Sequence, residues 1–293
     1  MVQEKIVVQA DSRYPLNGLL TLPDESFWPC PAVVLVHGSG SSNMDEKIQK
    51  VTPFKDLAEG LAKLGIASIR YDKRSFAHGF KLVTSKEVIT VKEETIDDAV
   101  AAVELLKQDT RINEVYVLGH SMGGMLAPRI DSQANVNGLI IMAGSPRTLH
   151  DILVEQLEEV ISKQNGFVKW IMNKSMSKMF TTITQLDDMT IEEAKKKKLG
   201  NGVTAYYFKE MMEHPTDELL RNLEKPVLFL QGQDDSQVKI DKDYMLYQQI
   251  MEGKTNCTFK LYEGLNHAFV QSLSVLYSCL ALLISVERLC TNA

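Results

Sequence analysis

Short apolar runs alternate along most of the chain with segments whose apolar residues recur every three or four positions, as at 54–64 and 96–106. The runs predict buried strands, and the recurring pattern predicts helices that cover a sheet with one face. This alternation is typical of a mostly parallel sheet in an α/β fold. Lys5–Gln9 and Leu16–Leu22 predict an antiparallel pair at the start. The later predicted strands are Ala32–Val36, Ala67–Tyr71, Val115–Leu118, Val136–Ala143, Pro226–Gln231 and Thr258–Tyr262.

The alternation stops at Pro146 and resumes after Leu223, and the stretch between them is helical in pattern with no convincing strand. We therefore expect residues 1–145 and 224–293 to form an α/β core, and residues 146–223 to form an inserted helical cap. Long insertions of this kind commonly act as active-site lids. Its methionines are interpreted as core filler or as an adaptable apolar pocket: Met172, Met176, Met179, Met189, Met211 and Met212. The run Lys195–Lys198 is interpreted as a solvated helix face rather than an anion site.

Composition narrows the class of protein only a little. The 293 residues are 44% hydrophobic and 24% charged, which is ordinary for a globular chain that folds around one large core. The net charge of −6 argues against a nucleic-acid partner. The four cysteines lack metal-ligand spacing, and the N-terminal residues lack the pattern of a signal peptide. We therefore expect reduced thiols, no bound metal, no membrane association and a cytoplasmic location.

The segment Gly119–Gly124, with the sequence Gly-His-Ser-Met-Gly-Gly, carries the strongest chemical signal. Its G-x-S-x-G core follows the predicted strand Val115–Leu118, which is the context of a nucleophile elbow. A serine on this sharp strand-to-helix turn needs glycines two residues before and after it, because the backbone passes close to itself there. The turn sets the hydroxyl at a helix N-terminus, where the dipole favours developing negative charge. Ser121 is therefore the candidate nucleophile. The helix that follows it contains Pro128, so we expect this helix to kink or end near that residue.

A serine hydroxyl needs a base to take its proton and a carboxylate to orient that base. The strand Pro226–Gln231 is followed by Asp234 and Asp235, and the strand Thr258–Tyr262 is followed by His267. Parallel sheets place their ligands at the carboxyl ends of the strands, so these side chains are expected near Ser121. The order nucleophile, acid, histidine is that of the α/β-hydrolases.

The chain resembles α/β-hydrolases of the esterase and dienelactone-hydrolase-like group, which includes feruloyl esterases and is related to the prolyl oligopeptidase catalytic domain. The resemblance extends from Leu16 to Phe269. It rests on His37-Gly38-Ser39-Gly40, Arg70-Tyr71-Asp72-Lys73-Arg74, the Ser121 elbow, Gly232-x-x-Asp235 and Asn266-His267. It implies the α/β-hydrolase fold with a mostly parallel sheet. It also implies that the triad acid is Asp235 rather than Asp234, since the family acid stands three residues after a glycine.

Acyl transfer also requires N–H donors aimed at the oxyanion, and losing one typically costs roughly a hundred- to a thousandfold in rate. The amide of Met122, the residue after the nucleophile, is one expected donor. The resemblance implies the amide of Ser39 as the second. His37 is expected to brace the loop, and His120 to point away from the nucleophile. Solvated or structural roles are expected for the remaining polar candidates: Asp72, Lys73, Arg74, His78, His150, His214, Tyr206 and Tyr207, with the two tyrosines as alternative substrate contacts.

These residues together predict a serine carboxylesterase without a cofactor or a metal ion. Ser121 would attack the acyl carbon of a small-molecule ester, His267 would move the proton, and Asp235 would hold the imidazolium. Resemblance alone suggests short-chain or aryl esters, including hydroxycinnamoyl esters. Thioester hydrolysis, cleavage of small peptides and a non-catalytic binding module are the alternatives. A dienelactone hydrolase would normally carry a cysteine nucleophile, and Ser121 argues against that activity.

The segment Ala268–Val286 is almost uncharged, which departs from the amphipathic closing helix that is usual in the family. Its length approaches the about 20 residues of a membrane span, but Gln271 and several serines dilute it. A buried closing helix or a homodimer contact is favoured over a tail anchor.

Overall fold

The computed structural model describes residues 1–85, 87–162, 166, 181–200, 202–271, 286 and 288–290. Met172, Met176, Met179 and most of the apolar segment 268–286 lie outside these residues, as do the interpretations that the sequence suggested for them.

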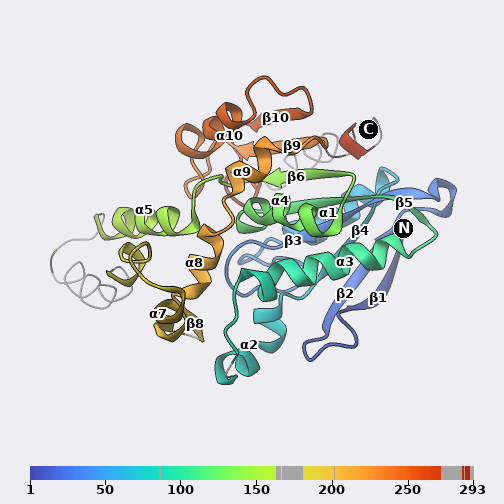
Figure 1. Cartoon of the computed structure of the whole chain (residues 1–293). Coiled ribbons are helices and arrows are strands. Elements are labelled where there is room, and N and C mark those ends of the chain that lie inside the picture. The colour runs from blue at the N-terminus through green and yellow to red at the C-terminus, as the bar shows by residue number, and fades with distance from the viewer. Residues whose placement is uncertain are drawn as a thin grey trace. The chain divides into compact units, whose positions relative to one another are not determined.

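The centre of the molecule is an eight-stranded sheet in the order β1-β2-β4-β3-β5-β6-β9-β10 (Figure 1). Its strands are β1 (Val2–Val8), β2 (Leu16–Leu22), β3 (Cys30–Val36), β4 (Ala67–Tyr71), β5 (Ile112–His120), β6 (Gly138–Met142), β9 (Val227–Gly232) and β10 (Cys257–Tyr262). Pairing is antiparallel between β1 and β2 and between β2 and β4, and parallel at every other junction. The predicted α/β fold with a mostly parallel sheet is confirmed.

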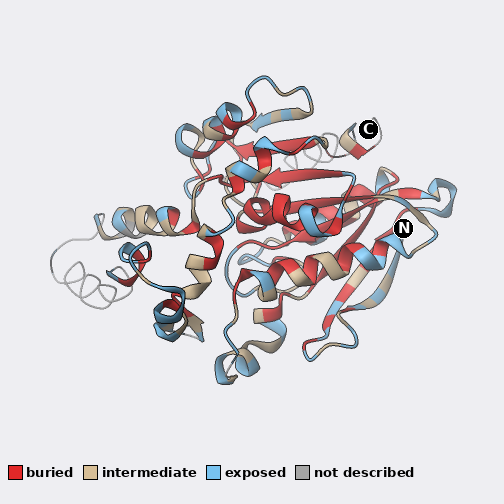
Figure 2. Ribbon diagram, in the orientation of Figure 1, coloured by how far each residue is buried: buried red, intermediate tan, exposed pale blue. Residues whose placement is uncertain are grey.

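The central strands are buried on both faces, as Figure 2 shows, because helices cover them. Val33 and Leu35 of β3 pack in one cluster with Phe54, Leu57 and Leu61, which lie on one face of α1. The helices are α1 (Pro53–Lys63), α2 (Arg74–Thr84), α3 (Asp97–Lys107), α4 (Met122–Ala134), α9 (Thr216–Arg221) and α10 (Met245–Ile250), with short helical turns at η1 (Glu25–Phe27), η2 (Lys92–Ile96) and η3 (Ile240–Tyr244).

Helix α4 does not end near Pro128, as one of the two expected outcomes required, but continues to Ala134. A proline inside a helix removes one N–H and crowds the carbonyls of the preceding turn. Here the hydroxyl of Thr216 donates to the Met125 carbonyl in that turn, at 3.1 Å. The carbonyl that loses its helical donor at Pro128 belongs to Gly124, one residue earlier, so this contact ties α9 to α4 and does not replace the missing bond.

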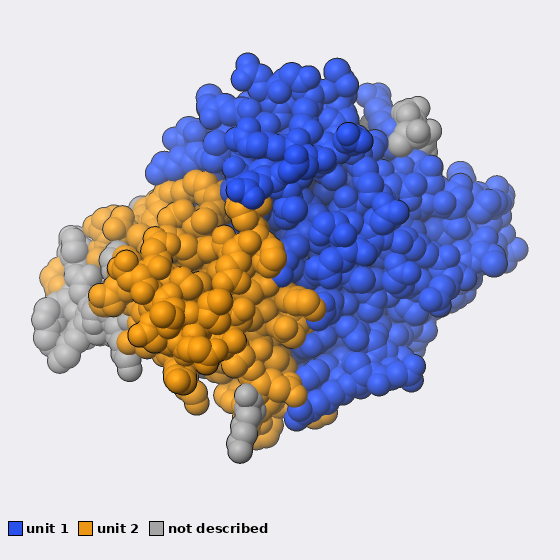
Figure 3. Space-filling view, in the orientation of Figure 1, with its two compact units in different colours: residues 1–79, 94–146, 216–293 blue, residues 80–93, 147–215 orange. Residues whose placement is uncertain are grey.

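The chain divides into two compact units, which Figure 3 colours separately. The first comprises residues 1–79, 94–146 and 216–293 and contains the large sheet; the second comprises residues 80–93 and 147–215. Residues 80–93 precede the predicted insertion in the sequence, and only tertiary contacts group them with it.

The second unit has its own small core of Ile183, Leu186, Ala194 and Ala205. Its elements are α5 (Leu149–Ser162), α7 (Ile191–Lys196), β7 (Lys198–Gly200), β8 (Val203–Thr204) and α8 (Tyr206–Met212). The antiparallel pair β7–β8 was not expected from the sequence. Strands of two or three residues are too short to show a twofold hydrophobic period.

Candidate active site

Ser121 stands on the turn between β5 and α4 with φ +53°, in the left-handed region that side chains seldom adopt. A Cβ atom at Gly119 would lie 2.1 Å from the Gly123 carbonyl oxygen, and one at Gly123 would lie 2.3 Å from the Val36 carbonyl oxygen. Only glycine fits at both positions. The Ser121 amide donates to the Met142 carbonyl at 2.9 Å, so β6 also holds the turn.

Asp235 and His267 are in direct contact, with 2.8 Å between Asp235 Oδ2 and His267 Nδ1. Asp235 follows β9 and His267 follows β10, and these neighbouring parallel strands place both residues at one edge of the sheet. Asp234 is exposed, and no contact between its side chain and His267 occurs among the described residues. Of the two adjacent carboxylates, only Asp235 has the geometry to orient the imidazole.

The surroundings of Asp235 keep its carboxylate ionised. Burial opposes ionisation, but the hydrogen bond from His267, its charge, and the amides of Val238 and Gln237 outweigh burial and lower the pKa of Asp235. The two amides donate to Oδ1 at 3.0 and 2.8 Å, and the side-chain amide of Gln231 donates to Oδ2 at 3.1 Å. A carboxylate held by this many donors is fixed in orientation, and so is the histidine ring that it binds.

The loop that follows β3 approaches Ser121 at Gly38, where an added Cβ atom would lie 3.1 Å from Ser121 Cβ. Lys73 is buried, and its Nζ donates to the Gly38 carbonyl at 2.7 Å. The peptide between Gly38 and Ser39 is trans, so its carbonyl and its N–H point in opposite directions. Because Lys73 holds the carbonyl of this peptide, the Ser39 N–H on the same peptide points away from Lys73. Met122 is the first residue of α4, where backbone N–H groups face outward from the helix end.

His37 and Asp72 brace the same loop. His37 Nε2 lies 3.0 Å from the Asn43 carbonyl, and burial lowers the pKa of His37 to about 4, so the neutral ring donates there. The Asp72 carboxylate accepts from the Met44 amide at 2.9 Å. These contacts agree with the bracing role that the sequence suggested for His37.

Glu46 is a buried residue near the site, and it was not among the site residues predicted from the sequence. Its Oε1 accepts from the Gly38 amide at 3.0 Å and lies 3.0 Å from His120 Nδ1, while His120 Nε2 lies 2.8 Å from the His267 carbonyl oxygen. Glu46 belongs to an irregular loop without periodic pattern. No local signal in the sequence distinguishes it from a solvated glutamate.

The other candidates have local partners. His78 Nε2 lies 2.8 Å from the Pro15 carbonyl oxygen, His150 contacts Thr148 and Asp151, and Arg74 pairs with the buried Asp98. The Lys195 ammonium lies over the Tyr206 ring at 5.1 Å. His214 Nε2 is 3.9 Å from a Glu210 oxygen, and the Tyr207 ring stacks edge-on against Phe208.

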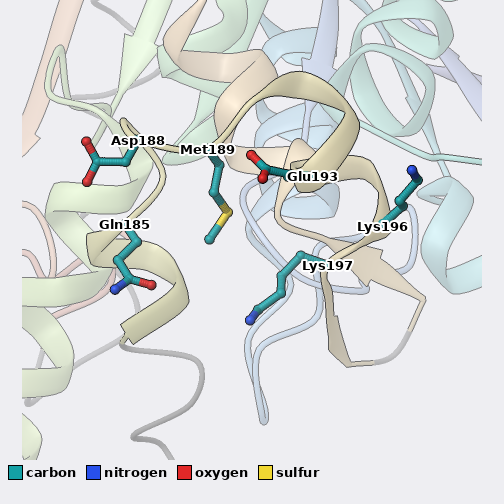
Figure 4. Close-up of a pocket in the computed structure, with 6 residues that line it drawn as sticks. All are labelled: Gln185, Asp188, Met189, Glu193, Lys196 and Lys197. Carbon is teal, nitrogen blue, oxygen red and sulfur yellow. The ribbon is translucent and has the colours of Figure 1, made fainter.

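The second unit contains a surface pocket of about 530 Å³, which Figure 4 shows in close-up. It is lined by Gln185, Asp188, Met189, Glu193, Lys196 and Lys197. None of the residues that the sequence proposed for catalysis lines it. Its two carboxylates balance its two ammonium groups. The run Lys195–Lys198 is largely exposed, as expected, but only its first two residues belong to a helix: α7 ends at Lys196 and β7 begins at Lys198.

Within the described part of the chain, no cluster of three or more histidine, cysteine, aspartate or glutamate side chains has the geometry of a metal site. A helix with the length and apolarity to cross a bilayer is likewise absent from the residues that the structure describes.

Comparison with known proteins identifies relatives of this chain. It is 34% identical over 256 residues to the esterase EstD of Thermotoga maritima, an alignment that covers 87% of this chain and 58% of EstD. The chain thus spans little more than half the length of that relative.

Similar folds occur in solved esterase structures. Est1E from Butyrivibrio proteoclasticus has a TM-score of 0.61 at 14% identity, over 97% of this chain and 96% of Est1E. The Pyrococcus furiosus esterase Pf2001 has a TM-score of 0.63 at 17% identity, over 98% and 89%. At such identities the likeness shows the fold alone.

The family model described as serine aminopeptidase, S33 matches residues 29–272. The chain therefore belongs to this family of α/β-hydrolases.

Proposed function

We propose that the protein is a serine carboxylesterase whose triad is Ser121, His267 and Asp235. The observation that supports this most is the 2.8 Å contact between His267 and the buried Asp235, in the fold that also holds Ser121 on a strained elbow. The relationship to EstD supports an ester as the substrate class.

In this mechanism, Ser121 Oγ attacks the acyl carbon while its proton passes to His267 Nε2. Asp235 keeps the other proton on Nδ1 and stabilises the imidazolium that forms. Collapse of the tetrahedral intermediate breaks the bond to the alcohol oxygen, which leaves with the proton from Nε2. Water then attacks the acyl-enzyme with His267 as base, and the carboxylic acid departs as Ser121 recovers its proton.

The amides of Met122 and Ser39 are proposed as the donors that stabilise the oxyanion. Met122 begins α4, so the positive end of the helix dipole adds to its N–H. Ser39 follows Gly38, whose carbonyl is held by the Lys73 ammonium. This hydrogen bond presets the Ser39 N–H before the reaction starts, and preorganisation of donors is what makes such a site effective.

Short-chain or aryl esters are the proposed substrates, hydroxycinnamoyl esters among them. The neighbour Est1E was solved with ferulic acid bound, and ferulic acid is a hydroxycinnamic acid. The family description, serine aminopeptidase, favours cleavage of small peptides as a second candidate. Both reactions pass through an acyl-enzyme, so side-by-side assays of an ester and an aminoacyl anilide separate them.

Residues 146–223 are proposed to act as a cap that selects the acyl and alcohol groups. The half-buried tyrosines of α8, Tyr206 and Tyr207, are the first residues to test, because large flat side chains suit aryl substrates. Tyr207→Ala is expected to change KM and the preferred ester length. Labelling of Ser121 by a small fluorophosphonate is expected to stay unchanged in this variant.

The first experiment pairs fluorophosphonate labelling with hydrolysis of p-nitrophenyl esters from acetate to decanoate, in wild type and Ser121→Ala. Labelling and turnover that both require Ser121 support the proposal. A folded wild-type protein that neither reacts with the probe nor cleaves any ester would contradict it and favour a non-catalytic binding module.

A cytoplasmic location and a diffusible small-molecule ester complete the proposal, with a homodimer as the assembly to test. Sedimentation velocity over a hundredfold range of concentration distinguishes a dimer from a monomer.

A further inference from the structure

Glu46 is a buried carboxylate whose contacts join two segments that are far apart in the sequence. It lies in the loop after β3 with only 4% of its surface exposed and with φ +49°. Its Oε1 receives the Gly38 amide and the His120 ring nitrogen, each at 3.0 Å. Its Oε2 is buried and has no hydrogen-bond partner among the described residues. A buried acceptor without a hydrogen-bond partner lowers the stability of the fold, so stability alone does not explain why a glutamate occupies this position.

His120 completes the connection because both of its ring nitrogens face oxygen atoms. The His267 carbonyl can only accept, so the 2.8 Å contact from Nε2 requires a proton on Nε2. Nδ1 faces Glu46 Oε1, which already accepts the Gly38 N–H. An ionised carboxylate has no proton to donate, so the 3.0 Å hydrogen bond between Nδ1 and Oε1 requires a second ring proton, on Nδ1. The geometry is therefore that of an imidazolium between a carboxylate and the backbone of His267.

The electrostatics of the pair agree with this protonation. Burial alone would disfavour the imidazolium, but the Glu46 charge and hydrogen bond outweigh burial and raise the pKa of His120. The pKa of Glu46 is lowered against burial, chiefly by the charge and the hydrogen bond of His120. The His120 ring also lies 4.8 Å from the His267 ring, centroid to centroid, at a tilt of 45°.

We propose that Glu46 and His120 form a positioning pair that couples the loop of Gly38 and Ser39 to the segment that carries His267. Among the described residues, neither side chain forms a hydrogen bond with the Ser121 side chain or with the His267 ring. Glu46 holds the Gly38 amide, one residue before the proposed oxyanion donor Ser39, and His120 holds the carbonyl of the proposed base. The pair thus keeps the oxyanion donor and the base in one geometry. This inference rests on the proposed triad.

Neutral replacements cannot keep all three contacts. The amide of Glu46→Gln can take either of two orientations. With its oxygen in the Oε1 position it still accepts from the Gly38 amide, but a neutral His120 has one ring proton for two acceptors, the glutamine oxygen and the His267 carbonyl. With its nitrogen in that position, the NH2 group faces the Gly38 N–H, and two donors oppose each other. His120→Gln removes the ring and leaves the Glu46 charge buried. Each variant therefore releases one of the two segments.

The test measures kcat and KM for p-nitrophenyl acetate in Glu46→Gln, His120→Gln and the double variant, below the melting temperature of each. We expect kcat to fall about 10- to 100-fold, with KM within about threefold, because misplacement affects the transition state more than binding. The kcat of the double variant should be no lower than the kcat of the less active single variant, because each single substitution already breaks the same coupled pair.

The matched control is Asp131→Asn, which removes the charge from the buried side of the Asp131–Lys225 ion pair, ten residues and so about 15 Å along α4 from Ser121. It should lower the melting temperature by a comparable amount and leave kcat near wild type. Unchanged kcat in both single variants, or fully additive losses in the double variant, would overturn the positioning pair. Ser121→Ala tests the triad separately, so the two ideas can fail independently.

Discussion

Replacing Asp235 by asparagine tests the proposed triad most sharply, because the structure dictates how the new amide must sit. In the wild type, Asp235 Oδ1 accepts hydrogen bonds from the backbone amides of Gln237 and Val238. Oδ2 accepts hydrogen bonds from the side chains of Gln231 and His267. An asparagine that keeps its oxygen at the Oδ1 position places its NH2 group against two donors. Gln231 cannot turn to accept, because its Nε2 also donates to the Gly232 and Val238 carbonyls.

His267 can relieve the conflict only by losing the proton on Nδ1. The remaining proton then resides on Nε2, the nitrogen that must accept the proton of Ser121, so the ring holds the wrong tautomer for a base. In the serine protease triad the same substitution lowers kcat about 10⁴-fold. We expect a similar loss in kcat/KM here, which corresponds to about 5 kcal/mol of transition-state stabilisation. The protein should stay folded, because the backbone contacts at Oδ1 persist.

The assay is steady-state hydrolysis of p-nitrophenyl acetate, with unfolding curves to verify the fold. Asp234→Asn is the matched control, since that neighbouring side chain is exposed, and its kcat/KM should stay within about twofold of wild type. Activity of Asp235→Asn within tenfold of wild type, alongside an inactive Ser121→Ala, would refute the tautomer argument. If Asp234→Asn lost more kcat/KM than Asp235→Asn, the acid of the triad would be Asp234 and our assignment would be wrong.

Three further outcomes follow from individual contacts. Gly123→Ala should lower the free energy of unfolding by about 3 kcal/mol or more, measured in urea, because its Cβ would meet the Val36 carbonyl at 2.3 Å and neither backbone can move aside. Lys73→Met should lower kcat about 10- to 100-fold with little change in KM, since it releases the Gly38 carbonyl, and an unchanged kcat would separate Lys73 from the oxyanion loop. The lowered pKa of Asp235 stabilises the fold above the ordinary carboxylate pKa of about 4, and this contribution is lost as the pH falls through the lowered value. The difference in unfolding free energy between wild type and Asp235→Asn should therefore shrink between pH 6 and pH 3 in urea titrations, and a constant difference would contradict the assignment.

Much of the sheet could be predicted because its strands are continuous apolar runs between helices with one apolar face. The expected strand Ala67–Tyr71 matches β4, and the expected antiparallel start matches the pairing of β1 with β2. The helix after Ser121 does not end near Pro128, which was one of the two outcomes expected there, but continues to Ala134. The antiparallel pair β7–β8 was not predicted, because strands of three and two residues are too short to show the alternation of apolar and polar residues that marks a strand.

The sequence by itself determined the fold class and the candidate chemical groups. Ser121, Asp235 and His267 each follow a buried strand, and parallel strands bring such positions to one edge whatever the loops do. Tertiary structure decided which polar groups face one another. It buries Asp235 against His267 and leaves Asp234 exposed, in agreement with what the family resemblance implied, and it joins Glu46 to His120 across 74 positions of sequence. The physical reason is that apolar periodicity is a local property, whereas a hydrogen bond between loops depends on how the whole chain has packed.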